Sequence, residues 1–145
     1  MAEVRGCRIP DDLYYWPEKH VWARPEADGT VTIGITDVAQ HLARAIINVT
    51  PRGVGRRVQR GKSAGTPESG KWVGPVTSPI SGEIVAVNEA AVAQPSLLNS
   101  DPYGRGWFAR LKPDDWEGES AELLTGTAAV RAYQELLARE GISCQ

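Results

Sequence analysis

The chain is organised around the stretch Thr66-Pro-Glu-Ser-Gly-Lys-Trp-Val-Gly-Pro-Val-Thr-Ser-Pro-Ile-Ser-Gly82. Glycine or proline interrupts it at nearly every point where a strand could continue, and β-prone segments lie at 73–77 and 83–87. This punctuation predicts a tight turn at residues 70–72. Lys71 then stands at the tip of the turn, where another protein can reach it. The alternative is a plain solvated charge, because most lysines are exposed.

Length and composition bound the problem. With 145 residues, the chain is expected to form a single domain (1–145) with an ordinary core. The net charge of −2 argues against a bulk nucleic-acid binder. The apolar runs of the chain are shorter than the about 20 residues that cross a bilayer. The first residues do not resemble a signal peptide. We therefore expect a cytoplasmic protein without membrane insertion. Cys7 and Cys144 lie at opposite ends and predict neither a disulfide framework nor a metal site.

Local signals predict several elements before the lysine. Residues 1–14 form an N-terminal arm that leads into an aromatic anchor at Tyr14-Tyr-Trp16. Asp28-Gly29, between β-rich runs at 21–24 and 30–35, predicts a hairpin. Thr36 is expected to cap a short helix over 37–43, with Val38, Leu42 and Ala39 on its apolar side. Residues 45–49 are apolar and β-branched, which favours a buried strand.

The segment from Pro51 to Lys62 carries five cations and no carboxylate. Its glycines and alternating valines predict one or two short edge strands with basic loops. A solvated edge is one interpretation, since charge keeps edge strands from pairing with other chains. The other is a docking surface for an acidic partner. The residues proposed for docking are Arg52, Arg56, Arg57 and Arg60.

After the lysine, a strand is expected at 83–88, a connection at 90–99, a type I turn at 101–104 and a closing strand at 107–111. Residues 114–119 predict an acidic loop. Ser120 is expected to cap a brief helix through Leu124, and Thr127 a C-terminal helix over 127–139. The predicted fold is mainly β: a compact sandwich or flattened barrel with short helices and a C-terminal helix.

Several segments, in order, resemble one family. These are Glu18-Lys-His-Val-Trp22, Gly34-Ile-Thr-Asp-Val-Ala-Gln40, Glu68-Ser69 with Lys71, Ser78-Pro-Ile-Ser-Gly-Glu-Ile-Val-Ala-Val-Asn-Glu89 and Leu98-Asn-Ser-Asp-Pro-Tyr-Gly-Arg-Gly-Trp107. They resemble the glycine cleavage system H protein, a lipoyl carrier, over residues 15–138. The resemblance implies a barrel-sandwich hybrid, or lipoyl-domain-like β-sandwich, with lipoate in amide linkage on Lys71. Glu68, Ser69, Gly70 and Trp72 would surround the attachment point.

The neighbourhood of the lysine departs from a typical glycine cleavage H protein. Gly70, Trp72 and Pro75 flank it, and the basic segment 52–62 lies where that family is typically acidic. These features look like the lipoate-binding proteins of the heterodisulfide-reductase-like system of sulfur-oxidising bacteria. That resemblance implies a carrier of a sulfur-bound intermediate, serving a heterodisulfide-reductase-like complex, a lipoate ligase and dihydrolipoamide dehydrogenase.

Two alternatives to a carrier of a sulfur-bound intermediate remain. One is a glycine cleavage H protein that carries an aminomethyl group between glycine decarboxylase and aminomethyltransferase. The other is an unmodified binding or scaffold domain.

No active site of its own is expected. His20 and His41 are the only histidines, and no nucleophile elbow, phosphate loop or metal cluster accompanies them. A histidine beside a tryptophan is most often a hydrogen-bonded structural residue. Trp72 and Val73 are candidates for one wall of a groove that shelters the arm, or else Trp72 is a half-buried turn residue. The chain is therefore predicted to be a carrier and not a free-standing enzyme.

Overall fold

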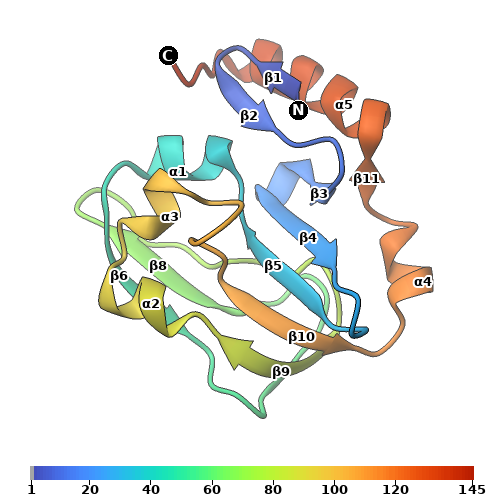
Figure 1. Cartoon of the computed structure of the whole chain (residues 1–145). Coiled ribbons are helices and arrows are strands. Elements are labelled where there is room, and N and C mark those ends of the chain that lie inside the picture. The colour runs from blue at the N-terminus through green and yellow to red at the C-terminus, as the bar shows by residue number, and fades with distance from the viewer. Residues whose placement is uncertain (1) are drawn as a thin grey trace.

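The computed structural model describes residues 2–145, and its centre is an antiparallel sheet of seven strands (Figure 1). The spatial order is β11, β3, β4, β5, β10, β9 and β7. Their bounds are β3 Tyr14–Trp16, β4 Val21–Pro25, β5 Val31–Ile35, β7 Arg57–Val58, β9 Gly82–Val87, β10 Ala109–Pro113 and β11 Leu124–Thr125. The predominance of β-structure confirms the predicted fold class.

A two-stranded ribbon, β6 (Ile46–Pro51) with β8 (Gly65–Ser69), forms the second layer. Buried side chains of the ribbon, such as Ile46 and Val49, join the same core as Val21, Ile33 and Phe108 of the main sheet and its margin. Burial of this apolar surface between the two layers is the main stabilising contribution. The arrangement is the predicted lipoyl-domain-like sandwich, and it leaves the turn after β8 at one end.

In the first third of the chain, the elements predicted from short-range sequence signals match the structure. Val21 pairs with Ile35 and Pro25 with Val31 across a hairpin whose Gly29 has φ 88°. This left-handed conformation suits glycine, because glycine has no Cβ to clash. Helix α1 (Asp37–Ala43) begins as predicted, with the Thr36 hydroxyl accepting the Ala39 N–H at 3.2 Å. The predicted hairpin and capped helix are therefore confirmed.

A second core lies between the main sheet and helix α5 (Gly126–Glu140), which covers the top of the sheet in Figure 1. Residues 2–9, inside the segment described above as an arm, form a hairpin of β1 (Ala2–Val4) and β2 (Cys7–Ile9) against α5. Buried Tyr133, Tyr15 and Trp22 fill the space. The indole N–H of Trp22 donates to the carbonyls of Ile35, at 2.9 Å, and Pro102, at 3.1 Å, so its burial leaves no polar atom unpaired.

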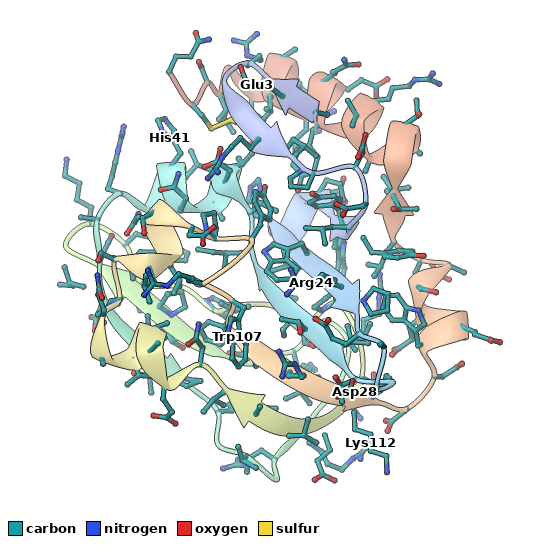
Figure 2. All side chains as sticks on the ribbon, in the orientation of Figure 1. Glu3, Arg24, Asp28, His41, Trp107 and Lys112 are labelled. Carbon is teal, nitrogen blue, oxygen red and sulfur yellow. A yellow bond between two sulfur atoms is a disulfide. The ribbon has the colours of Figure 1, made fainter. Side chains whose placement is uncertain are left out.

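The two cysteines form a disulfide, which the sequence analysis did not predict because it found no disulfide framework. Cys7 on β2 and Cys144 after α5 have Cα atoms 4.9 Å apart (Figure 2). The pairing was missed because the two ends of the chain meet only after α5 has packed on the hairpin. The meeting is reinforced by Arg5, whose carbonyl accepts the Cys144 N–H at 3.0 Å.

Other predictions in the second half were wrong in detail. The expected connection at 90–99 contains α2 (Glu89–Ala93) and α3 (Leu97–Ser100). The expected acidic loop contains α4 (Trp116–Ser120), capped by the Asp115 carboxylate, and β11 occupies the end of the helix predicted from Ser120. Buried Asn88 and exposed Asp115 are the caps that the sequence analysis overlooked. None of the helices within residues 2–145 combines the length and the apolar character that a membrane span requires.

Candidate functional site

Lys71 lies on a two-residue turn that connects β8 to the segment after it. The Ser69 N–H donates to the Trp72 carbonyl at 2.7 Å, and Glu68 forms an antiparallel bridge with Val73. The Ser69 hydroxyl also accepts the Lys71 N–H at 3.3 Å. Gly70 and Lys71 are exposed, and Lys71 takes part in no ion pair among residues 2–145. The backbone of the turn is held, while the lysine side chain is available to another protein.

The residues next to the lysine have structural partners that fix the turn. Glu68 accepts a hydrogen bond from the Asn48 amide at 3.1 Å, across the pairing of β6 with β8. The Trp72 indole lies over Gly74, where a Cβ would come within 2.3 Å of the ring. Gly74 therefore lets the indole fold back onto its own segment. Trp72 remains 42% exposed and Val73 63% exposed.

A pocket of about 130 Å³ opens beside the lysine turn. Trp72 and Pro75 form its wall on the turn side, and Ala39 and Leu42 belong to its wall on α1. The remaining lining residues are Lys19, His20, Val21, Ile35 and Ala43. Leu42 is 47% exposed, so its predicted place on the buried side of the helix was wrong: it faces this pocket. Trp72 lines the pocket, as the sequence analysis proposed, and Val73 is not among the lining residues.

His20 lines the pocket with an unusual backbone conformation and a buried ring nitrogen. It ends the short 3-10 helix η1 (Pro17–Lys19) in a left-handed conformation with φ 57°. Its Nδ1 is buried and has no hydrogen-bond partner within residues 2–145. Burial lowers the pKa of His20, while the carboxylates of Glu140 and Glu18 oppose this shift. The ring is therefore held mostly neutral beside the apolar lining.

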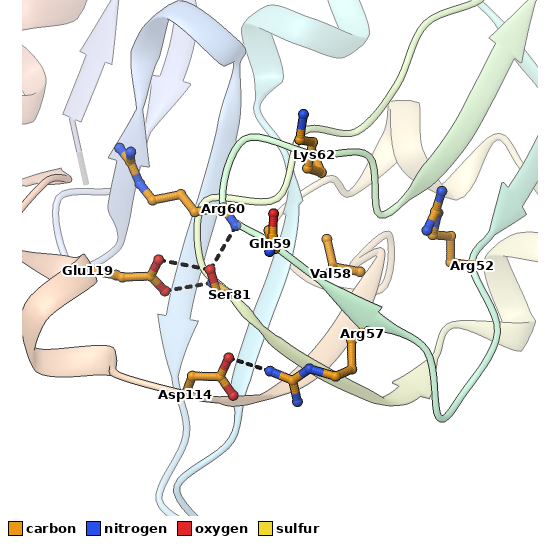
Figure 3. Close-up of a pocket in the computed structure, with 9 residues that line it drawn as sticks. All are labelled: Arg52, Arg57, Val58, Gln59, Arg60, Lys62, Ser81, Asp114 and Glu119. Carbon is orange, nitrogen blue, oxygen red and sulfur yellow. Dashed lines mark hydrogen bonds and ion pairs between the residues drawn. The ribbon is translucent and has the colours of Figure 1, made fainter.

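The predicted docking arginines lie one strand length away from the lysine. Arg57 sits on β7, the last strand of the main sheet, and forms an ion pair with Asp114 (Figure 3). The guanidinium of Arg60 stacks 4.0 Å from the centre of the Trp16 ring. Arg52, Arg57 and Arg60 line an open pocket of about 930 Å³, which Arg56 does not line. The structure thus gathers three of the four arginines around one hollow.

The sequence analysis missed the apolar pocket as a unit. Its members come from η1, β4, β5, α1 and the lysine turn, and no single segment carries the whole pattern. His20 had been interpreted as a hydrogen-bonded structural residue, yet its buried nitrogen has no partner in the described chain. His41, the other histidine, lies on α1 outside the pocket (Figure 2). No cluster of three metal-ligating side chains occurs within residues 2–145.

Comparison with known proteins agrees with this geometry. The family model described as glycine cleavage H-protein matches residues 13–136. Glycine cleavage system H protein 2 of Aquifex aeolicus is 47% identical over 99% of this chain and 89% of its own length. H protein 5 of the same organism is 46% identical over 99% of both chains. A crystal structure of a glycine cleavage system H protein from Mycobacterium marinum superposes with a TM-score of 0.74 at 36% identity, over 92% of this chain and 100% of that one.

The match covers both layers of the sandwich, the lysine turn, the apolar pocket and most of helix α5. The chain belongs to the glycine cleavage H-protein family.

Proposed function

We propose that the chain is a lipoyl carrier whose lipoate is attached through the ε-amine of Lys71. The observation that carries this proposal is an exposed lysine on a rigid two-residue turn, without an ion-pair partner among the described residues, in a chain of this family. A lysine fixed at its backbone and mobile at its tip suits a swinging arm. Glu68 and Ser69 contribute by holding the turn.

The residues around Lys71 fit the proposed cofactor. Amide formation removes the charge of the lysine, so the arm can enter an apolar pocket without the cost of burying an ammonium group. Trp72, Pro75 and Leu42 supply apolar walls within reach of the turn. His20 also lines the pocket, and burial lowers its pKa, which favours a neutral ring there. Lipoate, when attached, supplies a disulfide that opens on reduction and closes on oxidation.

The role in glycine cleavage is the pathway that the family membership supports best. In this role the chain would carry an aminomethyl group from glycine decarboxylase to aminomethyltransferase, with dihydrolipoamide dehydrogenase to reoxidise the arm and a lipoate ligase to attach it. The protein supplies position and shelter, and its partners supply the chemistry. We therefore rank this role above sulfur oxidation, which the sequence analysis had placed first.

Sulfur transfer with a heterodisulfide-reductase-like complex remains a second candidate because one observation favours it. Seven of the 16 cations but only one of the 18 carboxylates lie within residues 44–71, which gives this part of the chain a strongly basic character. A partner fitted to an acidic carrier would lose complementarity there. Aquifex aeolicus has H proteins numbered 2 and 5 among the relatives, so one organism holds several H proteins, and they need not share one pathway.

Lipoylation by a purified lipoate ligase tests the attachment site. The wild-type protein and Lys62→Arg should both gain the mass of one lipoyl amide, while Lys71→Arg should gain none. Lys62 is the matched control, since it is also an exposed lysine next to a turn. Modification of Lys71→Arg, or none of the wild type, would contradict the proposal and leave the unmodified scaffold as the better account.

Reconstituted glycine cleavage separates the two pathways. With glycine decarboxylase, aminomethyltransferase and dihydrolipoamide dehydrogenase from the same host, the lipoylated chain should support glycine-dependent reduction of NAD. Failure of this assay, together with loss of thiosulfate oxidation in a strain that lacks the gene, would instead favour the sulfur-transfer candidate.

A further inference from the structure

Charge is distributed unevenly over this chain. Residues 44–71 contain seven cations and one carboxylate, leaving nine cations and 17 carboxylates for the rest. Although the net charge of the chain is −2, residues 44–71 are basic and the rest of the chain is acidic. We call Arg52, Arg56, Arg57, Arg60 and Lys62 the basic surface. In Figure 1 the loop that begins this segment lies at the lower edge of the molecule, whereas Arg60, further along, reaches Trp16 of β3.

The two acidic side chains that line the hollow are already engaged. Asp114 forms an ion pair with Arg57, and the Glu119 carboxylate accepts the Ser81 N–H at 2.6 Å and the Ser81 hydroxyl at 3.0 Å. Arg52 and Lys62 line the same open pocket and belong to no ion pair within residues 2–145. The hollow therefore offers positive charge that the described chain does not neutralise.

The directions of the charged side chains around the hollow indicate whether it suits a small anion or a protein surface. In Figure 3, the charged ends of Arg52, Arg60 and Lys62 are spread apart and do not meet at one point, and Arg57 is turned toward Asp114. One small anion needs several donors that converge on it, which these side chains do not do. A protein surface with several separated carboxylates matches them better. A nucleic acid would meet repulsion from the 17 carboxylates outside residues 44–71.

The basic surface and the lysine turn are close enough for one partner. Pro51 pairs with Gly65 at the end of β8 near the basic surface, and Ser69 at the other end leads into the turn. The two ends are four residue steps apart along the strand, or roughly 13 Å at the usual rise per residue. An interface of standard size, about 800 Å² per partner, is about 30 Å across and can include both.

We propose that the basic surface docks an acidic face of a partner enzyme that acts on the Lys71 arm. This inference rests on the proposed carrier function. Electrostatic attraction between such faces raises the association rate and orients the carrier before the arm reaches the active site. Arg52 and Lys62 are the residues to change, because both line the hollow without an ion pair, whereas Arg57 pairs with Asp114, Arg60 stacks on Trp16 and Arg56 lies outside the lining.

The test compares two charge reversals of equal size. Arg52→Glu/Lys62→Glu changes the basic surface, and Arg131→Glu/Arg139→Glu makes the same net change on the exposed side of α5. Each lipoylated protein is titrated against purified glycine decarboxylase from the host, and the association rate is measured at 20 mM and 300 mM salt. Thermal unfolding and intact mass verify that both variants are folded and loaded.

At low salt, Arg52→Glu/Lys62→Glu should associate at least fivefold more slowly than the wild type, and at high salt the difference should shrink. The α5 control should change the rate less than twofold. Equal rates for the two variants, or a wild-type rate that salt does not affect, would overturn the proposal.

Two further measurements keep the proposals separate. Reduction of the lipoyl group by dithiothreitol should be the same in the wild type and in both variants, so a failure of docking differs from a failure of the carrier site. Binding of a 20-base-pair DNA duplex by the wild type, lost in Arg52→Glu/Lys62→Glu, would overturn the protein partner in favour of nucleic acid.

Discussion

Removal of the Cys7–Cys144 disulfide should lower the free energy of unfolding substantially without changing the fold. The bond joins residues separated by 137 positions, so in the unfolded state it closes almost the whole chain into a ring. The variant to make is Cys7→Ala/Cys144→Ala, because a single replacement leaves a thiol that reacts between molecules. The hydrogen bonds of Arg5 to Ile142 and Cys144 still attach the β1–β2 turn to the C-terminal segment.

The magnitude follows from the length of the closed loop. The chain-entropy relation for a loop of this length sets a ceiling of about 5 kcal/mol at 25 °C. Measured effects are commonly smaller, since the open chain retains some structure, so we expect the free energy of unfolding to fall by about 2 to 4 kcal/mol. For a chain of this size, the midpoint of thermal unfolding should then fall by about 5 to 15 °C.

Circular dichroism, recorded during heating with and without reductant, measures this effect. The oxidised wild type should unfold at the highest temperature, and the reduced wild type should approach the double variant. The double variant should be insensitive to reductant, which controls for other effects of the reagent. A double variant within about 2 °C of the oxidised wild type would refute the reasoning, because the bond would then constrain nothing that the hairpin does not already fix.

Three further predictions concern the core and the pocket. Gly34→Ala should lower the free energy of unfolding in urea by about 1 to 3 kcal/mol, because a Cβ there would lie within 2.6 Å of the Trp22 ring, and an unchanged midpoint would contradict this contact. Burial lowers the pKa of His20 in the folded state, so the unfolded chain binds more protons than the folded chain as the pH falls below about 6.5. The stability of the wild type relative to His20→Gln should therefore decline below that pH, and a constant difference from pH 5 to 8 would count against the buried neutral ring. Trp72→Ala should speed the reduction of the attached lipoyl group by dithiothreitol several-fold, whereas Val73→Ala, next to it but outside the pocket lining, should not; equal rates would argue against the shelter.

Elements with local signals were predictable from sequence. Asp28-Gly29 defines its hairpin through a backbone conformation that glycine adopts easily, and Thr36 begins α1 by accepting a backbone N–H. The lysine turn belongs to this class, because glycine and proline interrupt the chain on both sides of Lys71. Its interpretation as an attachment point came from the resemblance to a family.

Features that depend on distant segments were not predictable in the same way. The disulfide requires α5 to pack on the N-terminal hairpin before its cysteines meet. Leu42 appeared to belong to the core because the spacing of the helix allowed it, and only the lysine turn opposite makes its position a pocket wall. Helix α4 was missed because its Asp115 cap stands in a run of carboxylates that suggested a loop.

The mass of the protein purified from its native host tests the central claim most directly. After digestion, one peptide that spans Lys71 should carry the increment of a single lipoyl amide, and the intact chain should show no second addition. The peptides that contain Lys19, Lys62 and Lys112 should be unmodified. An unmodified Lys71, or lipoate on one of those other lysines, would contradict the carrier function proposed for this chain.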